Sequence, residues 1–482
     1  APRVAESNVT AELYRDTFGF RKVIIQVTRQ GKIYASDAGN KGRLIWEKSL
    51  VGYGQGEGEA EPKLKVHGLF QTRDSLGAAR TPLVTLIADV QMDEDAPIIT
   101  RAFDFDPITG KFEKDAQEGL PINVGGAKDA FMLPSSTNED PTAKKLVGVI
   151  DKNNRLVVYP ASAGRLALQA LQSKFYYALP TLSAGTQAAL QGYTVAADGS
   201  STPTWKVRLA LGELITDVIA PTSAAIASQG KVLGDRSTLY KYLNPHGHVI
   251  VTSNPTTHSA GIYLVDYVSG KVLHETQIQH VDAASGVHVV FIENWIVVSY
   301  SSSLPEEGLV TRLVSVEIYE DSTRDQTWEW TGNFSSFGRS AAASGSGSGN
   351  SVRAYQQTYN FPRQIRALGT TATKFGISIR NLLIATDEGY VFNIPRRMLD
   401  PRRPVGRKPT QAESEEWLIP YDPTVPDQMK WTLSHVNMVK KAEQIITAPA
   451  LLESTSLVLV NGLDTFFTRV TPSNTFDLLS SE

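Results

Sequence analysis

Short apolar runs of β-branched and aromatic residues alternate with two- to four-residue polar turns along most of this chain. Runs of this kind, joined by residues that tolerate a positive φ, are typical of β-hairpins. We expect four clear hairpins, in the segments 23–34, 146–159, 382–394 and 457–470. Their turns should lie at residues 29–31, 151–154, 387–389 and 461–462.

A second pattern follows some of these hairpins: an apolar strand, an aspartate, a short turn that ends in glycine, a basic residue and another strand. It occurs at residues 33–46, 102–112 and 262–273. The aspartate can accept hydrogen bonds from backbone amides of the turn, while Gly42, Gly110 and Gly270 can adopt the left-handed conformation. The pattern therefore predicts an Asx-type turn between two strands, with a structural role.

Repeats of about 40 to 50 residues that carry four strands each are typical of a β-propeller. We expect an all-β fold, a propeller of seven or eight blades with loop insertions. The blades should begin near Arg21, Thr81, Lys144, Lys174, Tyr240, Val287, Ile365 and Ile445. Helical periodicity is limited to residues 161–173 and 412–417.

Three stretches have the composition of insertions between strands. Residues 52–62 and 335–350 are rich in Gly and Ser or Glu, and residues 396–422 are rich in Pro and Arg. None of them requires a domain boundary. We expect residues 1–482 to form a single propeller domain, with a flexible Gly/Ser loop at 335–350 and a Pro/Arg-rich insertion at 396–422.

Composition changes this picture little. The 482 residues exceed the roughly 250 to 300 at which one compact core stops growing, which favours a modular fold. The net charge of −3 comes from evenly spread charges, so no global field favours nucleic acid or an anionic membrane surface. With no cysteine, the chain has no disulfide, thiolate metal site or cysteine nucleophile, but its compartment stays open.

Apolar stretches are too short to span a membrane, since even residues 288–300 are interrupted by Glu293 and Asn294. The first residues contain no apolar signal core and no initial Met. We interpret the chain as a processed product or an excised fragment, so the lack of a signal excludes nothing.

Motifs for catalysis are weak. Glycines at 52, 54, 56 and 58 lack the spacing and the following helix of a phosphate loop, and nearby glutamates would repel phosphate. His246 and His248 alternate without a further ligand motif, and no serine has a nucleophile-elbow context. The acidic pairs 306–307 and 415–416 are expected to be solvated. We expect no catalytic, cofactor or metal site, and hence no enzyme.

Basic residues concentrate in one place, where two prolines, Pro401 and Pro404, stiffen the chain. The run comprises Arg396, Arg397, Arg402, Arg403, Arg407 and Lys408. It lacks the interleaved aromatic residues of a nucleic-acid surface. Arg402, Arg403 and Asp400 are candidates for charge-assisted contacts with a protein partner; lipid headgroups or a solvated loop are the alternatives.

Two N-x-S/T sequons, at Asn8 and Asn333, lie in polar surroundings and are glycosylation candidates. They are compatible with a lumenal location but do not establish it.

Several segments that no propeller rule demands resemble one family. They are residues 234–245 (GDRSTLYKYLNP), 293–295 (ENW), 399–404 (LDPRRP), 419–421 (IPY) and 447–456 (TAPALLESTS), followed by 462–464 (GLD) and 468–473 (TRVTPS). In this order they resemble the C-terminal lumenal region of the family of subunit 1 of the endoplasmic reticulum (ER) membrane protein complex. The family's long N-terminal region and its transmembrane helix are missing, and residues 340–350 match nothing in the family.

The resemblance implies a lumenal scaffold at the ER membrane, within a complex that inserts tail-anchored and multi-pass membrane proteins. Its partners would be other subunits of that complex, with membrane-protein clients or lumenal chaperones as further candidates. It also implies a membrane anchor shortly after Glu482 in the parent protein. One alternative is a stand-alone peptide- or protein-binding propeller. The other is a quinoprotein-like dehydrogenase, because the Asp-to-Gly turns resemble repeats found in such propellers. That enzyme would need a calcium and quinone site.

Overall fold

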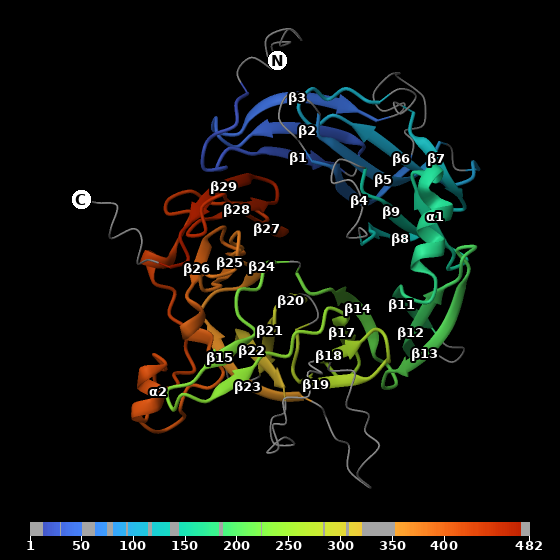
Figure 1. The fold of residues 1–482 in the computed structure, drawn as a ribbon. Coiled ribbons are helices and arrows are strands. Elements are labelled where there is room, and N and C mark those ends of the chain that lie inside the picture. Colours follow the sequence, from blue (N-terminus) through green and yellow to red (C-terminus); the bar gives the residue numbers. More distant parts are fainter. Residues whose placement is uncertain are drawn as a thin grey trace. The chain divides into compact units, whose positions relative to one another are not determined.

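A computed structural model describes residues 13–28, 30–50, 63–74, 81–92, 95–113, 118–134, 144–182, 187–222, 224–282, 285–304, 308–320 and 352–473. Most of the regular secondary structure in these residues is antiparallel β-strand, with few helices (Figure 1). The prediction of an all-β chain is confirmed. The chain divides into two compact units: unit 1 comprises residues 1–177 and 192–204, and unit 2 comprises residues 178–191 and 205–482.

Unit 1 contains three sheets and the longer helix. The first sheet is β1 (Val23–Val27), β2 (Lys32–Asp37) and β3 (Arg43–Ser49), in that order. The second is β4 (Lys63–Arg73), β5 (Leu83–Gln91), β6 (Ile99–Phe105) and β7 (Leu120–Val124). In the third, β9 (Val147–Asp151) lies between β8 (Ala127–Met132) and β10 (Leu156–Tyr159), and α1 (Ala161–Leu171) follows.

The boundary between the units runs through one sheet, formed by β11 (Tyr176–Leu182), β12 (Ala188–Val195) and β13 (Ser201–Arg208). The expectation of a single domain over residues 1–482 stays a prediction, as does the number of blades.

Unit 2 holds the remaining sheets. One consists of β14 (Leu214–Ile219), β17 (Gly247–Asn254), β18 (Ser259–Asp266) and β19 (Val272–Ile278), and a small hairpin consists of β15 (Gly230–Val232) and β16 (Thr238–Tyr240). Next come β20 (Val287–Ile292), β21 (Trp295–Leu304), β22 (Gly308–Glu320) and β23 (Val352–Phe361). The last two sheets are β24 (Ile365–Thr370), β25 (Leu382–Thr386) and β26 (Val391–Ile394), and then β27 (Gln444–Pro449), β28 (Ser456–Asn461) and β29 (Thr465–Val470).

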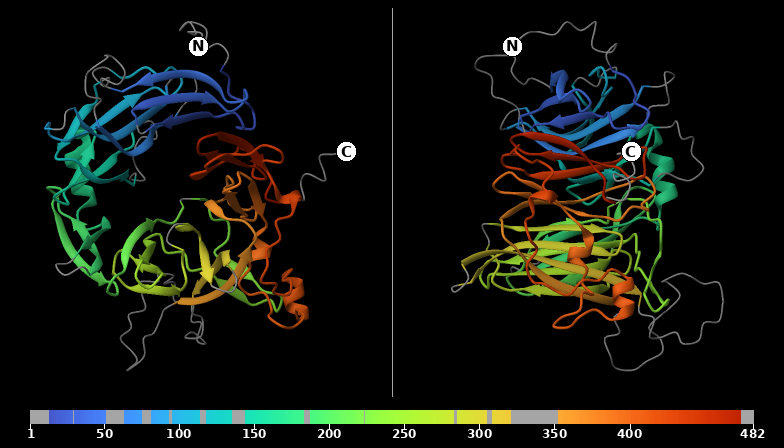
Figure 2. Two further views of the ribbon diagram at one scale, coloured as in Figure 1. Left: turned by 180° about the vertical axis from the view of Figure 1, so that it is seen from behind. Right: turned by 90° about the vertical axis from the view of Figure 1, so that its left-hand side faces the viewer.

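Successive sheets of unit 2 pack face to face (Figure 1 and Figure 2). Apolar residues of β17–β19 meet those of β20–β23 in one buried cluster, and the other face of β20–β23 meets β24–β26 in a second. A third cluster joins β24–β26 to β27–β29. Because alternate residues of a strand point to opposite faces, a sheet packed on both sides reads as a nearly continuous apolar run, as in 382–386 (LLIAT).

The predicted hairpins and short helices are present. β1 pairs with β2, β9 with β10, β25 with β26 and β28 with β29, each across a turn that overlaps the predicted one. Residue 29 of the first turn lies outside the described residues, and in the last hairpin Asn461 still pairs with Thr465, so the turn comprises residues 462–464. Helix α1 and the short helix α2 (Gln411–Glu415) occupy the two helical segments expected from the sequence.

The predicted Asp-to-Gly turns are confirmed, and they gain a partner that the sequence did not reveal. Asp106 accepts a hydrogen bond from the amide of Ile108 at 2.8 Å, and Gly110 adopts a φ of 68°. The indole of Trp46 on β3 donates to the carbonyl of Pro107 at 3.0 Å, so β3 docks on the turn of the next sheet. In unit 2, Trp205 makes the same contact with the carbonyl of Tyr267, in the turn that Asp266 opens, at 2.9 Å.

Of the three predicted insertions, residues 52–62 and 335–350 lie outside the described residues. The third, residues 396–422, contains the 3-10 helix η5 (Arg396–Leu399) and helix α2, and a further 3-10 helix, η6 (Met429–Trp431), follows it. No helix in the described part of the chain is long and apolar enough to cross a bilayer.

Candidate functional site: a buried ion-pair network beneath residues 396–422

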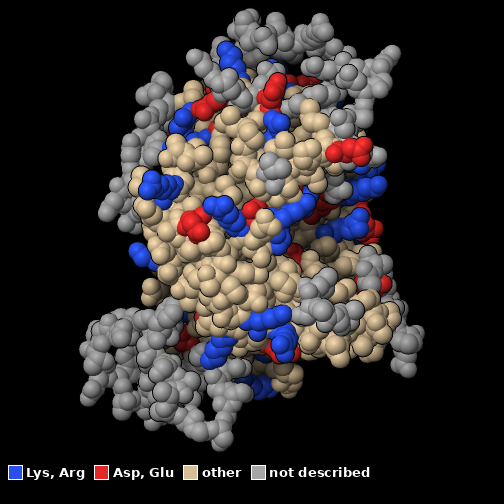
Figure 3. Space-filling view, turned by 90° about the vertical axis from the view of Figure 1, so that its right-hand side faces the viewer, with Lys and Arg blue, Asp and Glu red and all other residues tan. Residues whose placement is uncertain are grey.

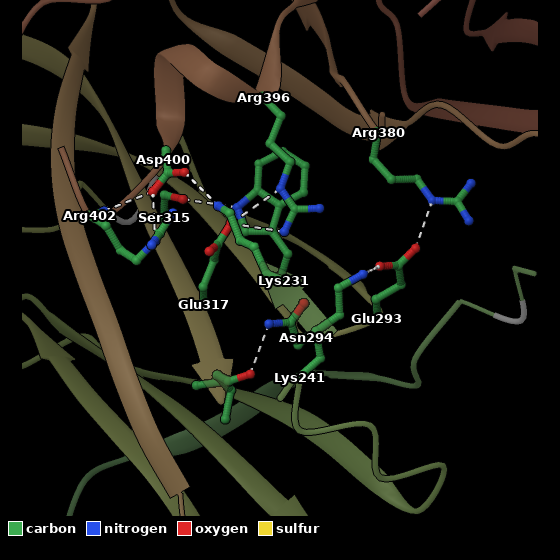
Figure 4. A network of polar contacts seen from close by, with 12 residues as sticks. Lys231, Lys241, Glu293, Asn294, Ser315, Glu317, Arg380, Arg396, Asp400 and Arg402 are labelled. Carbon is green, nitrogen blue, oxygen red and sulfur yellow. Dashed lines mark hydrogen bonds and ion pairs between the residues drawn. The ribbon is translucent and has the colours of Figure 1, made fainter. Parts of the chain in front are cut away.

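The Pro/Arg-rich segment 396–422 is attached to the sheet β20–β23 through Arg396 (Figure 4). Trp295 on β21 and Glu317 on β22 are paired across neighbouring strands, so their side chains share one face of the sheet. The Arg396 guanidinium donates to Glu317 Oε1 at 2.8 and 3.2 Å and lies 4.7 Å from the centre of the Trp295 ring. This planar cation thus combines an ion pair with a cation–π contact.

Glu317 is fully buried, and burial alone would raise the pKa of its carboxyl. Attraction to Arg396 and Lys231, with hydrogen bonds from Tyr319 and Arg396, outweighs burial and lowers the pKa to about 2. The carboxylate is therefore ionised at neutral pH. A charge in this position requires its partners, because an unpaired buried charge is costly.

A second chain of contacts ties the segment to the hairpin β15-β16. Lys231 on β15 lies 2.9 Å from Asp400, and Arg402 lies 3.6 Å from Asp400 and 2.6 Å from Glu416. Glu416 also accepts a hydrogen bond from the amide of Gly234 at 3.2 Å. These alternating charges connect both ends of the segment to a hairpin far away in the sequence.

A third set of contacts centres on Glu293, in the β20–β21 turn. Lys241 and Arg380 lie 2.8 and 3.2 Å from its two carboxylate oxygens. Burial raises the pKa of Glu293, but the hydrogen bond from Lys241 and the nearby cations prevail and lower it. Asn294 donates to the carbonyl of Ile318 at 2.9 Å, which fixes the same turn to β22.

The three partner-contact candidates lie together, and all three face the chain's own groups. Asp400 and Arg403 are 7% and 3% exposed. Arg403 donates to the carbonyl of Met398 at 2.7 Å and to that of Pro420, and it lies near the rings of Tyr359 and Tyr421. Direct contact of Arg402, Arg403 and Asp400 with a partner stays a prediction.

The expectation that the acidic pair 415–416 is solvated was wrong for Glu416. Its carboxylate is only 9% exposed, because Arg402 and the hairpin β15-β16 cover it. Residues 306–307, the other acidic pair, lie outside the described residues, as do the glycosylation candidates Asn8 and Asn333.

Sequence reasoning did not identify Glu317. The signal is its position in β22, where Leu313, Ser315, Glu317 and Tyr319 alternate with Val314, Val316 and Ile318. An acidic residue inside an apolar strand needs a cation, but several basic residues lie closer in the sequence than Arg396, so the sequence does not show which one pairs with it.

Over the network lies a groove of about 470 Å³, with Leu233, Tyr355, Pro401, Pro404 and Leu418 among its lining residues. Arg402 and Arg403 form part of its wall, and the ion pair of Arg407 with Glu413 lies at the same groove. Next to Glu416, Trp417 is 78% exposed and adopts a φ of 61°. It occupies the position after a helix C-cap where glycine is usual.

The chemistry of this arrangement is structural and electrostatic. Each charged group of the network has an opposite charge or a carbonyl within hydrogen-bond reach. Within the described ranges, no group of three or more His, Asp or Glu residues could hold a metal ion. On the described part of the face drawn in Figure 3, basic and acidic side chains are interspersed between uncharged areas.

Comparison with known proteins gives a consistent result. Residues 19–473 match the model of a family described as ER membrane protein complex subunit 1, second beta-propeller. The match confirms the predicted propeller fold and agrees with the resemblance in the sequence motifs.

Individual relatives are named ER membrane protein complex subunit 1. The Xenopus laevis ER membrane protein complex subunit 1 is 31% identical over 98% of this chain, and the Saccharomyces cerevisiae protein is 27% identical over 96% of it. The chain spans 44% and 56% of their lengths. Among solved structures, hydrazine synthase of Kuenenia stuttgartiensis covers 80% of this chain and is itself 93% covered, at 8% identity and a TM-score of 0.33, which is too low to support an argument.

Proposed function

The chain belongs to the family of ER membrane protein complex subunit 1, as its second β-propeller, and on this premise we propose that it is a non-catalytic lumenal scaffold of that complex. The name of the family gives the location as the ER membrane. That this domain lies on the lumenal side is part of the proposal. The complex inserts tail-anchored and multi-pass membrane proteins, and this domain contributes by docking other subunits. Membrane-protein clients and lumenal chaperones are further candidate partners.

The observation that supports this role is that Trp417 is exposed and directly follows Glu416, which an ion pair and a hydrogen bond hold in place. A left-handed conformation costs a residue with a Cβ roughly 1 to 2 kcal/mol, and Trp417 adopts it at the end of helix α2 with its side chain 78% exposed. Trp is among the residues most enriched at interaction hot spots. A strained and exposed Trp beside a groove therefore fits a binding residue better than a structural one.

The buried network explains how Trp417 is held. Glu416, the preceding residue, is fixed by Arg402 and by the amide of Gly234. In this proposal Trp417 and the exposed Val405 contact the partner directly. Arg402, Arg403 and Asp400 contribute by holding the groove in position. A rigid surface lowers the entropy cost of docking.

The test uses the full-length subunit in its cells of origin, with the complex purified through another subunit. We expect Trp417→Ala to leave the domain folded and to lower recovery of the tagged complex at least about threefold, because a hot-spot Trp contributes about 2 kcal/mol or more to binding. The control is Leu211→Ala, which removes another large side chain, 73% exposed, outside the segment. Recovery at the wild-type level for Trp417→Ala, with a normal thermal transition, would rule out this docking surface.

A further inference from the structure

A second pocket, of about 330 Å³, lies in unit 2 at the end of the sheet β24–β26. Its walls come from the loop before β25, the end of β26, the 3-10 helix η6 and the residues after β29. Its lining residues include Ile379, Asn381, Asn393, Arg397, Lys430 and Trp431.

Backbone contacts fix these walls to one another. Thr432, which follows η6, bridges to Phe392 on β26, and the amide of Leu433 donates to the carbonyl of Val391 at 2.7 Å. Asn381 donates from its side chain to the carbonyl of Pro472 at 3.3 Å and accepts from the amide of Arg396 at 3.4 Å. The pocket is therefore a preformed feature that joins three separate parts of unit 2.

The pocket carries uncompensated positive charge. Arg397 and Lys430 are exposed, and no described carboxylate pairs with either of them. Arg396 also lines the pocket, but its charge is offset by Glu317. None of the described lining residues is acidic, so the pocket favours an anion.

The remaining walls are suited to an organic anion rather than a small inorganic one. Trp431, Leu433, Ile379 and two prolines supply apolar surface that a phosphate would leave unfilled. Among the described residues, none forms a hydrogen bond with the buried side-chain oxygen of Asn393, whose amide can turn to offer a donor or an acceptor. This mixture fits a carboxylate with a peptide bond and an apolar side chain next to it.

Apolar residues continue from the pocket along the loop before β25. Phe375, Ile377 and Ile379 are 54%, 69% and 63% exposed. Glu453 accepts hydrogen bonds from the amides of Phe375 at 2.6 Å and Ile377 at 2.7 Å, which fixes this loop. Exposed apolar side chains on a fixed loop are typical of a surface that another chain covers.

We infer that this pocket binds a carboxylate of an extended apolar peptide. Arg397 and Lys430 contact the carboxylate, and the loop 375–379 contacts the apolar side chains of the residues that precede it in the peptide. The carboxylate is either the C-terminus of the peptide or a side chain within it. The inference does not depend on the proposed assembly role, because binding is measured on this chain alone.

The experiment is fluorescence anisotropy with the labelled peptide Ala-Leu-Val-Leu-Ala-Ile, first as the free acid. If the terminal carboxylate is the ligand, the C-terminal amide binds at least about tenfold more weakly. If a side-chain carboxylate of the peptide is the ligand, an amidated peptide with Glu before the last residue binds at least as well as the free acid. Either result supports the inference.

Variants show whether the pocket is responsible. We expect Arg397→Glu with Lys430→Glu to weaken binding at least about tenfold. The matched control, Lys111→Glu with Lys174→Glu, makes the same charge change at two exposed lysines outside the pocket and should alter the dissociation constant less than about twofold.

Four results would overturn the inference. If none of the three peptides binds, a peptide is not the ligand. If the Arg397→Glu, Lys430→Glu variant still binds the peptide, the pocket is not the binding site. Phosphatidylserine vesicles that bind through these two residues while the peptides do not would identify a membrane surface instead. Peptide binding by a chain that ends at Ser473, but not by the full chain, would show that residues 474–482 are the occupant.

Discussion

Glu317 and Glu413 share a pKa of about 2 but differ in their surroundings. In Glu413 a hydrogen bond from Arg407 is the main cause of the low pKa, and the pair lies at the surface. In Glu317 burial opposes ionisation, and Arg396, Lys231 and Tyr319 overcome it. Because solvent screens the first pair and not the second, only the second should matter strongly for stability.

We therefore predict that Glu317→Gln lowers the free energy of unfolding by about 3 kcal/mol, because it leaves the largely buried guanidinium of Arg396 without its counter-charge. Glu413→Gln, the surface control, should cost about 1 kcal/mol or less. Urea denaturation followed by tryptophan fluorescence measures both. Equal losses for the two variants would contradict the structural role assigned to the buried pair.

The same pair predicts a pH dependence. The pKa of Glu317 is lower in the folded state than its ordinary value of 4.5, so its contribution is fully present above pH 4.5 and is lost as the pH falls toward about 2. Stability of the wild-type chain should decline over that window more steeply than that of Glu317→Gln.

Sequence alone indicated where the charged segment lies but not which way its side chains point. The prolines and arginines of 396–408 predicted a stiff basic loop, and the loop is there. The direction of Arg403 depends on the carbonyls of Met398 and Pro420, which only the folded backbone brings together. Burial of Arg402 likewise depends on Glu416, whose environment is set by a hairpin about 180 residues earlier.

At the level of elements, the Asp-to-Gly turn combines residues that act within the turn with a tryptophan that contacts it from far away in the sequence. The aspartate and the glycine were predictable because both act within five residues of one another. The docked tryptophan was not, since Trp205 reaches a turn 62 residues later. A Cβ at Gly270 would lie 2.5 Å from Cδ2 of Trp205, so glycine is needed there for space as well as for its φ of 71°.

This contact gives a matched pair of variants. Gly286 has the same φ of 71°, but a Cβ at this position would meet no atom within 4 Å, so Gly286→Ala should cost only the backbone strain, roughly 1 to 2 kcal/mol. Gly270→Ala should cost about 1 to 3 kcal/mol more, because Trp205 must move. Thermal or urea unfolding measures the difference. Equal losses would mean that the tryptophan adapts freely and does not lock the turn.

Hairpins were the most predictable elements, because a strand such as β25 and its turn at residues 387–389 carry their own signals. Edges of the sheets were less predictable. The segment after η6 bridges to β26 without any strand-like pattern, and it is this irregular pairing that builds the second pocket.

At the scale of the whole molecule, the family model that matches residues 19–473 is described as a β-propeller. Repetition of hairpins predicted that class, since each blade needs a neighbour to bury its faces. The proposed partner surface has no such repeat. It comes from the one long insertion described in unit 2, where the ion-pair network, the groove and Trp417 lie together.

The most direct test of the scaffold account is crosslinking mass spectrometry on the intact complex with a lysine-reactive reagent. Lys408 is exposed and follows Arg407, which lines the groove beside the segment that carries Trp417. The account predicts crosslinks between Lys408 and another subunit, and their loss in the Trp417→Ala variant. Crosslinks from Lys408 only to its own chain, in a complex whose other lysines link the subunits, would contradict it.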